Sequence, residues 1–136
     1  MTPVYYSKFI NREDLQLNPN CLFVFGDNTE RYGLGGQAKS MRGEPNAHGI
    51  ATLWRPGKYF EDKDYDQIVS ILDFDLGKLA GLIQVRKPRS IVFPMCGIGT
   101  GLAYMELHAP KAYDYLCSQL ELQFGIINCI IDSRRE

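Results

Sequence analysis

The chain has 136 residues, of which 45% are hydrophobic and 23% charged, values typical of a globular domain. This composition excludes a disordered or fibrous chain, and the length predicts one domain over 1–136 whose core needs no disulfide or metal. The net charge of −1 excludes a general electrostatic attraction to nucleic acid or to an anionic membrane, so an anion would have to be held by a local site.

Signals for membranes and metals are also missing from the sequence. Residues 1–14 lack the basic and apolar segments of a secretory signal, and no stretch approaches the roughly 20 apolar residues that span a bilayer. Cys21, Cys96, Cys117 and Cys129 are widely spaced and include no Cys-x-x-Cys pair, so we expect buried free thiols and no metal site. The expectation is a cytoplasmic protein with no membrane contact and no cofactor.

Three strands are predicted in the N-terminal part of the chain. Residues 4–10 alternate between apolar and polar side chains. Residues 21–26 form a short apolar run that stops at glycine, which is typical of a central strand covered on both faces. Residues 49–54 form a further strand that is closed by Pro56 and Gly57.

Two helices and two more strands are predicted in the rest of the chain. Apolar residues recur at spacings of three and four over 64–86, which predicts an amphipathic helix. A second helix over 110–124 begins with proline, whose missing N–H is harmless in the first turn. Apolar runs predict strands at 90–95 and 125–132, and a solvated tail at 133–136 follows. Strands that alternate with helices predict a three-layer α/β fold with a mostly parallel sheet.

Two glycine-rich stretches each follow a predicted strand. They are FGDNTERYGLGGQAKSMRG at 25–43 and CGIGTG at 96–101. In open α/β sheets ligands bind outside the carboxyl ends of the strands, and glycine lets successive N–H groups point at phosphate oxygens. Neither stretch is a Walker A loop or a dinucleotide fingerprint, so a nucleoside triphosphatase or a nicotinamide dehydrogenase is not expected.

The two loops together resemble the macrodomain superfamily, whose members bind ADP-ribose. Asn28 at a strand end, followed by TERYG and then LGGQAKSM, is similar to the first family motif. The second motif is similar to IVFPMCGIGTGLAYM at 91–105. The resemblance covers roughly 21–132, and it is specific in these loops. It implies a three-layer α/β/α macrodomain-like fold whose ligand is ADP-ribose or a related nucleotide, free or attached to an ADP-ribosylated protein or nucleic acid.

The resemblance also implies which residues bind the ligand. Backbone amides of the second loop would wrap the diphosphate, and an adjacent aromatic would pack on the ribose. These positions are Cys96, Gly97, Ile98, Gly99, Thr100, Gly101, Leu102 and Tyr104. The first loop would face the distal ribose with Asn28, Gly35, Gly36 and Gln37.

The catalytic group is less well defined by the sequence. Asn28 would orient the distal ribose, and Lys39 or Asp27 would carry out the chemistry if the protein hydrolyses an ADP-ribosyl linkage. The alternatives are a turn role for Asn28, a capping role for Asp27, and an exposed basic face that contains Lys39 and Arg42. Ala103 stands where related hydrolases carry an aspartate, so a non-catalytic binding module is the second hypothesis and a protein-interaction domain is the third.

Overall fold

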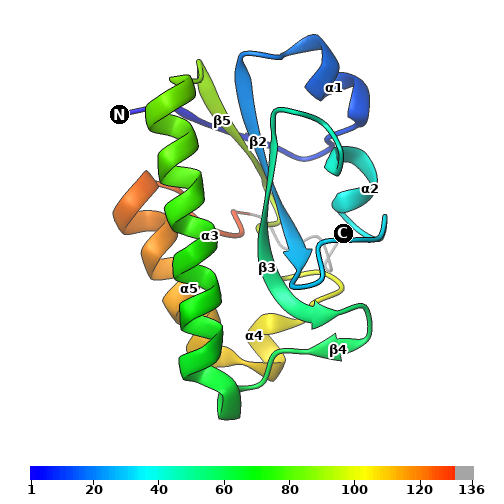
Figure 1. Cartoon of the computed structure of the whole chain (residues 1–136), viewed down its shortest axis with the longest axis vertical. Coiled ribbons are helices and arrows are strands. Elements are labelled where there is room, and N and C mark those ends of the chain that lie inside the picture. The colour runs from blue at the N-terminus through cyan, green and yellow to red at the C-terminus, as the bar shows by residue number, and fades with distance from the viewer. Residues whose placement is uncertain (131–136) are drawn as a thin grey trace.

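The computed structural model describes residues 1–130 and has a mixed α/β fold with a five-stranded sheet (Figure 1). The strands lie in the order β1-β5-β2-β3-β4. Their bounds are β1 Val4–Ser7, β2 Cys21–Asn28, β3 Ala47–Arg55, β4 Lys58–Tyr59 and β5 Ser90–Pro94. All pairings are parallel except that of β4, which is antiparallel to β3. The prediction of a mostly parallel sheet is therefore confirmed.

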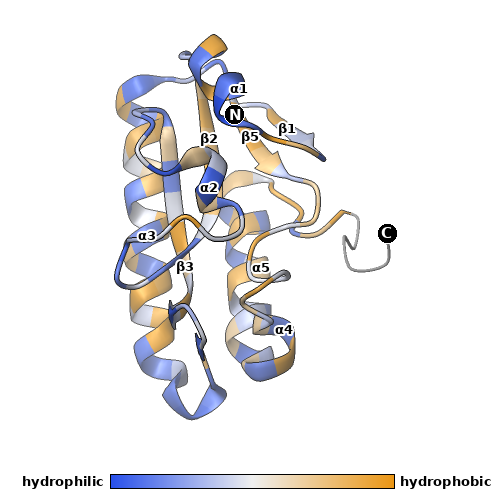
Figure 2. Ribbon diagram, turned by 90° about the vertical axis from the view of Figure 1, so that its right-hand side faces the viewer, coloured by the Kyte–Doolittle hydropathy of each residue, from blue (hydrophilic) through white to orange (hydrophobic). Residues whose placement is uncertain are grey.

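The helices differ greatly in length. They are α1 Arg12–Leu17, α2 Ala38–Met41, α3 Tyr65–Arg86, α4 Met105–His108 and α5 Pro110–Phe124, with a 3₁₀ turn at Asp62–Asp64. The long helices α3 and α5 lie on one side of the sheet, and the short helices α1 and α2 lie on the other side (Figure 1). Strands β2 and β5, which lie between these two groups of helices, consist largely of hydrophobic residues (Figure 2).

Strand β2 is buried on both faces, as its unbroken apolar run predicts. Leu22 and Val24 belong to the core on the α3 and α5 side. Phe23 and Phe25 pack instead with residues of α1 and α2. Because successive side chains of a strand point to opposite faces, this run of four apolar residues supplies both cores.

The predicted helices over 64–86 and 110–124 are present as α3 and α5. Pro110 occupies the first turn of α5, and Gly125 ends this helix with a φ of +67°. Helix α1 was not predicted. It begins at a capping box in which the Asn11 side chain accepts a hydrogen bond from Asp14 N, and the Asp14 side chain accepts one from Asn11 N.

Two of the strand predictions need correction. The strand predicted over 4–10 ends at Ser7. The strand predicted over 125–132 is wrong for residues 125–130, and its last two positions, like the tail at 133–136, lie outside the described residues. Strand β5 already pairs with β1 on one side and β2 on the other, so it has no free edge for another strand. Within 1–130, no helix is long and apolar enough to span a bilayer.

Candidate functional site

A pocket of about 650 Å³ lies at the carboxyl ends of β1, β2 and β5. Both glycine-rich loops contribute to its wall, together with the segment after β1 and the turn that joins β3 to β4. The two loops approach each other closely, since a Cβ placed on Gly36 would lie 3.5 Å from Leu102 Cδ1. The volume falls within the range of small-molecule sites, which is about 300–1,000 Å³.

The second loop presents a run of backbone N–H groups without partners in the part of the chain that the structure describes. Gly97 and Gly99 have φ values of +81° and +79°, and the loop closes with a 2.7 Å hydrogen bond from Met105 N to Gly99 O. Among residues 1–130, the amides from Gly99 to Ala103 have no hydrogen-bond partner. Successive free N–H groups in a turn of this kind form an anion-binding concavity.

The side chain of Gln37 joins the two loops. Its Oε1 atom accepts a 2.7 Å hydrogen bond from Gly26 N at the end of β2. Its Nε2 atom donates a 2.9 Å hydrogen bond to Gly97 O and also points at Cys96 Sγ, 3.8 Å away. Gln37 therefore acts as a brace between the loops, and it lines the pocket as well.

Replacing Gln37 with leucine is expected to lower the free energy of unfolding by about 1–3 kcal/mol, because Gly26 N–H loses its acceptor in a partly buried place. Urea unfolding followed by circular dichroism measures this change. Ser40→Ala serves as the control, since Ser40 also lines the pocket but makes no side-chain hydrogen bond within the described residues. Equal stability of Gln37→Leu and wild type would contradict the bracing role.

The side chain of Asn28 builds a turn at the end of β2. Its Oδ1 atom accepts a 2.9 Å hydrogen bond from Glu30 N, and its Nδ2 atom donates a 2.9 Å hydrogen bond to Tyr32 O. Asn28 is buried and lines the pocket. Asn28 therefore has the turn role that the sequence left open. A ligand contact by Asn28 would use the hydrogen-bonding capacity that remains on the same side-chain amide.

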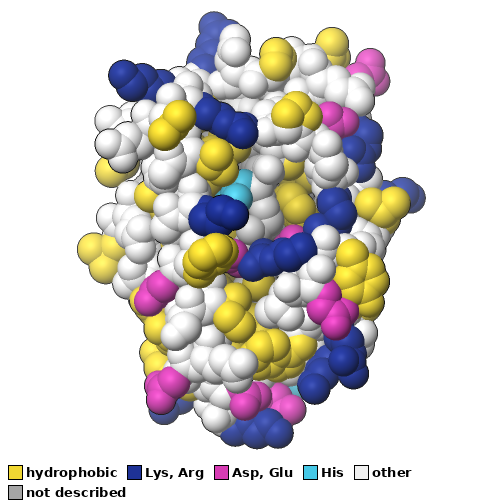
Figure 3. All heavy atoms as spheres, viewed as in Figure 1, with side chains coloured by type: hydrophobic (Ala, Val, Ile, Leu, Met, Phe, Trp, Pro, Cys, Tyr) yellow, Lys and Arg dark blue, Asp and Glu magenta, His cyan; other side chains and the backbone are white. Residues whose placement is uncertain are grey.

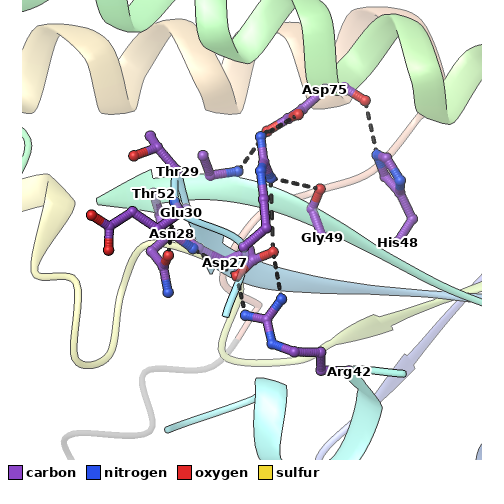
Figure 4. A network of polar contacts seen from close by, with 12 residues as sticks. Asp27, Asn28, Thr29, Glu30, Arg42, His48, Gly49, Thr52 and Asp75 are labelled. Atoms are coloured by element: carbon purple, nitrogen blue, oxygen red, sulfur yellow. Dashed lines mark hydrogen bonds and ion pairs between the residues drawn. The ribbon is translucent and has the colours of Figure 1, made fainter. Parts of the chain in front are cut away.

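Asp27, which lines the pocket, lies in a network of ion pairs (Figure 4). Its buried carboxylate pairs with Arg42, including a 3.2 Å hydrogen bond from Arg42 Nη1, and lies 3.8 Å from Arg31 Nη1. Arg42 Nε also donates a 2.7 Å hydrogen bond to Gly33 O. Arg42 therefore ties the first loop to β2 and is not part of a freely solvated basic face.

Arg31 carries the network to helix α3. Its Nη2 atom donates hydrogen bonds of 2.6 and 2.7 Å to both carboxylate oxygens of Asp75. Asp75 is buried and also accepts a 2.8 Å hydrogen bond from Ala51 N in β3. His48 Nε2 donates a 2.9 Å hydrogen bond to Asp75 O, as Figure 4 shows. The first loop is thereby tied to the long helix on the far side of the sheet.

The stability of the protein is expected to fall as the pH drops from 7 to 5. Burial lowers the pKa of His48 below its usual value of 6.5, so the unfolded chain takes up this proton at a higher pH than the folded chain. The contribution of His48 to the free energy of unfolding is complete above pH 6.5 and is lost progressively below this pH. Urea unfolding at several pH values should show a smaller decline for His48→Gln than for wild type, and an equal decline would contradict the role of His48.

The structure brings many of the implied site residues together and leaves others out. Those that line the pocket are Asp27, Asn28, Gly35, Gly36, Gln37, Cys96, Gly99, Gly101 and Leu102. Those outside the lining are Lys39, Gly97, Ile98, Thr100 and Tyr104. Lys39 is exposed on α2 and does not line the pocket.

A comparison with protein-family models matches residues 5–119 to DUF7831, a family of unknown function. The chain belongs to the DUF7831 family. No curated protein and no solved structure matches it.

Several pocket residues of this DUF7831 chain were missed by the sequence analysis. Phe9, in the segment after β1, lines the pocket although it is 81% exposed. Tyr59 of β4 also lines it, and the Tyr59 ring stacks on His108 with centroids 4.2 Å apart. No motif marks either residue, because each is brought to the pocket by the topology of the sheet.

Cys21, Cys96 and Cys117 of the DUF7831 chain are free thiols, as expected, but these three and Cys129 are half-buried and not fully buried. Cys96 is the cysteine that lines the pocket. Within the described residues 1–130, no cluster of His, Cys, Asp and Glu is arranged to hold a metal ion.

Proposed function

We propose that the chain binds ADP-ribose, or a nucleotide of similar shape, in this pocket, and that its fold is a three-layer macrodomain fold. The observation that carries the proposal is the run of amides from Gly99 to Ala103 beside the pocket, which have no hydrogen-bond partner within residues 1–130. In the proposed complex these N–H groups bind the oxygens of the diphosphate. The first loop, with Asn28, Gly35 and Gly36, faces the distal ribose.

The charge distribution favours a local anion site of this kind. Basic and acidic side chains are interspersed on the face shown in Figure 3, so this face has no broad positive field. Arg42, which lines the pocket, is already paired with Asp27. Backbone dipoles that are fixed before the ligand arrives can offset the charge of a diphosphate without extra cationic side chains.

Calorimetric titration with ADP-ribose tests the proposal, with ribose and adenosine as ligands that lack the diphosphate. We expect ADP-ribose to bind and both controls to bind much more weakly. At 100 times the dissociation constant, a ligand stabilises the folded state by about 2.7 kcal/mol, so ADP-ribose should also raise the melting temperature. No heat and no thermal shift at millimolar ADP-ribose would instead favour a protein-interaction domain.

The second candidate function is hydrolysis of an ADP-ribosyl linkage, and it is favoured by the position of Asp27. Of the described residues that line the pocket, Asp27 alone carries a carboxylate. In this mechanism Asp27 accepts a proton from water while the water oxygen bonds to the anomeric carbon. The bond from that carbon to the modified group breaks at the same time, and its electron pair leaves with the oxygen or nitrogen atom of that group.

Release of ADP-ribose from modified protein or nucleic acid, measured for wild type and two variants, tests the catalytic proposal. Asp27→Asn should abolish release and retain part of the ADP-ribose binding, because asparagine keeps one side-chain acceptor for Arg42. Lys39→Ala should match wild type in both, since Lys39 is exposed and outside the pocket lining. Binding by wild type without any release would leave the binding module as the function, and loss of release in Lys39→Ala would assign the chemistry to that lysine.

A further inference from the structure

The segment after α5 packs behind the second glycine-rich loop. Gly125 ends the helix in the left-handed region, and Ile126 N donates a 3.1 Å hydrogen bond back to Leu120 O. The chain then reaches the loop at Asn128. A Cβ placed on Gly97 would lie only 2.6 Å from both Asn128 Oδ1 and Cys129 N. The loop and this segment therefore approach at a distance that only glycine permits.

The carboxamide of Asn128 binds both polar groups of one loop residue. Its Oδ1 atom accepts a 2.8 Å hydrogen bond from Ile98 N, and its Nδ2 atom donates a 3.1 Å hydrogen bond to Ile98 O. The Nδ2 atom also lies 3.1 Å from Tyr113 Oη and 3.6 Å from Cys117 Sγ. With its oxygen facing an N–H and its nitrogen facing acceptors, the amide has one favourable orientation.

The partners of Asn128 on α5 are neutral at pH 7. Burial raises the pKa of the Cys117 thiol, and burial also raises the pKa of the Tyr113 hydroxyl. These neutral partners therefore add no charge of their own beside the carboxamide, and Asn128 stays available to Ile98.

The hydrogen bonds to Ile98 occur immediately before the Gly99–Ala103 amides. Gly97 O on one side is held by Gln37 Nε2, and Gly99 O on the other side accepts the bond from Met105 N. The peptide groups on both sides of Ile98 are thus fixed by side chains or backbone from other elements. Because the backbone is fixed at Ile98, the direction of the Gly99–Ala103 amides that follow is also set.

We propose that Asn128 is a positioning residue of the anion-binding loop. Its two hydrogen bonds to Ile98 hold the Gly99–Ala103 amides in the orientation that binds ligand phosphates. The inference rests on the proposed binding of ADP-ribose or a related nucleotide. Asn128 does not line the pocket, so it acts through the loop and not by touching the ligand.

The test compares Asn128→Ala and Asn128→Asp with Tyr113→Phe, which removes one partner of Asn128 and leaves both bonds to Ile98 in place. The first measurement is the dissociation constant for ADP-ribose by calorimetry. The second is hydrogen exchange of the ligand-free protein, read by mass spectrometry on peptides that cover 97–105. Asn128→Asp keeps the size of the side chain and the acceptor for Ile98 N, so it provides a folded variant if Asn128→Ala is too unstable.

We expect both Asn128 variants to bind ADP-ribose at least about tenfold more weakly, which corresponds to the roughly 1.4 kcal/mol of a lost, partly buried hydrogen bond. Exchange should accelerate in 97–105 and stay unchanged in α3, while Tyr113→Phe should remain within about twofold of wild type in affinity.

Two results would overturn the proposal while leaving ADP-ribose binding intact. One is wild-type affinity in a folded Asn128 variant, and the other is faster exchange throughout the core, which would reveal a general structural role. A wild-type protein that binds no ADP-ribose would overturn the proposed function and this inference together, and the exchange data would still show whether Asn128 orders the loop.

Discussion

Replacing Gly97 with alanine is expected to lower the free energy of unfolding by about 2–6 kcal/mol. Gly97 has a φ of +81°, which costs a residue with a Cβ about 1–3 kcal/mol. The new methyl group would also lie 2.6 Å from Asn128 Oδ1 and from Cys129 N, and such overpacking costs about 1–3 kcal/mol more. Because Cys129 N is a backbone atom, the neighbour cannot move aside by changing a rotamer.

Urea unfolding measures this effect, and Gly101→Ala is its matched control in the same loop. A Cβ on Gly101 meets no atom within 4 Å, and Gly101 is not among the glycines with positive φ. The control should therefore stay within about 0.5 kcal/mol of wild type. Similar stability of the two variants would show that the close packing behind the second loop is absent in solution.

Replacing Asp75 with alanine is expected to lower the free energy of unfolding by about 3 kcal/mol, the lower end of the range for breaking a buried ion pair. Asp75 is 2% exposed, and its loss leaves Ala51 N–H without an acceptor and Arg31 without its bidentate partner. The Arg31 side chain is 37% exposed, so water can solvate part of the freed charge. This solvation is why the lower end of the range applies.

The matched control is Asp73→Ala, two residues earlier on α3. Asp73 is exposed and accepts a hydrogen bond from the Tyr115 hydroxyl. Its removal should cost less than about 1.5 kcal/mol in the same unfolding experiment. Since Arg31 belongs to the first loop, Asp75→Ala should also weaken ADP-ribose binding, whereas Asp73→Ala should not. Equal losses of stability in the two variants would contradict the network of Figure 4.

Much of the fold follows from local signals in the sequence. The apolar run of β2 has no polar residue at alternate positions, which predicts burial on both faces of the sheet. The proline and glycine at the two ends of α5 bound that helix at 110–124. The failures have specific causes. Helix α1 has a capping box in its sequence, but its six residues are too few for a periodic pattern. The run at 125–130 is as apolar as a strand, yet β5 has no free edge for it.

Local sequence patterns are enough to place the two glycine-rich loops after strands, and in a parallel sheet the carboxyl ends of neighbouring strands meet at one edge. Which side chains support those loops depends on the three-dimensional packing. Arg31 meets Asp75 across 44 positions, and Asn128 meets Ile98 across 30. Propensity, capping and periodicity act over a few residues, whereas these contacts depend on how the strands are ordered and how the helices pack on them.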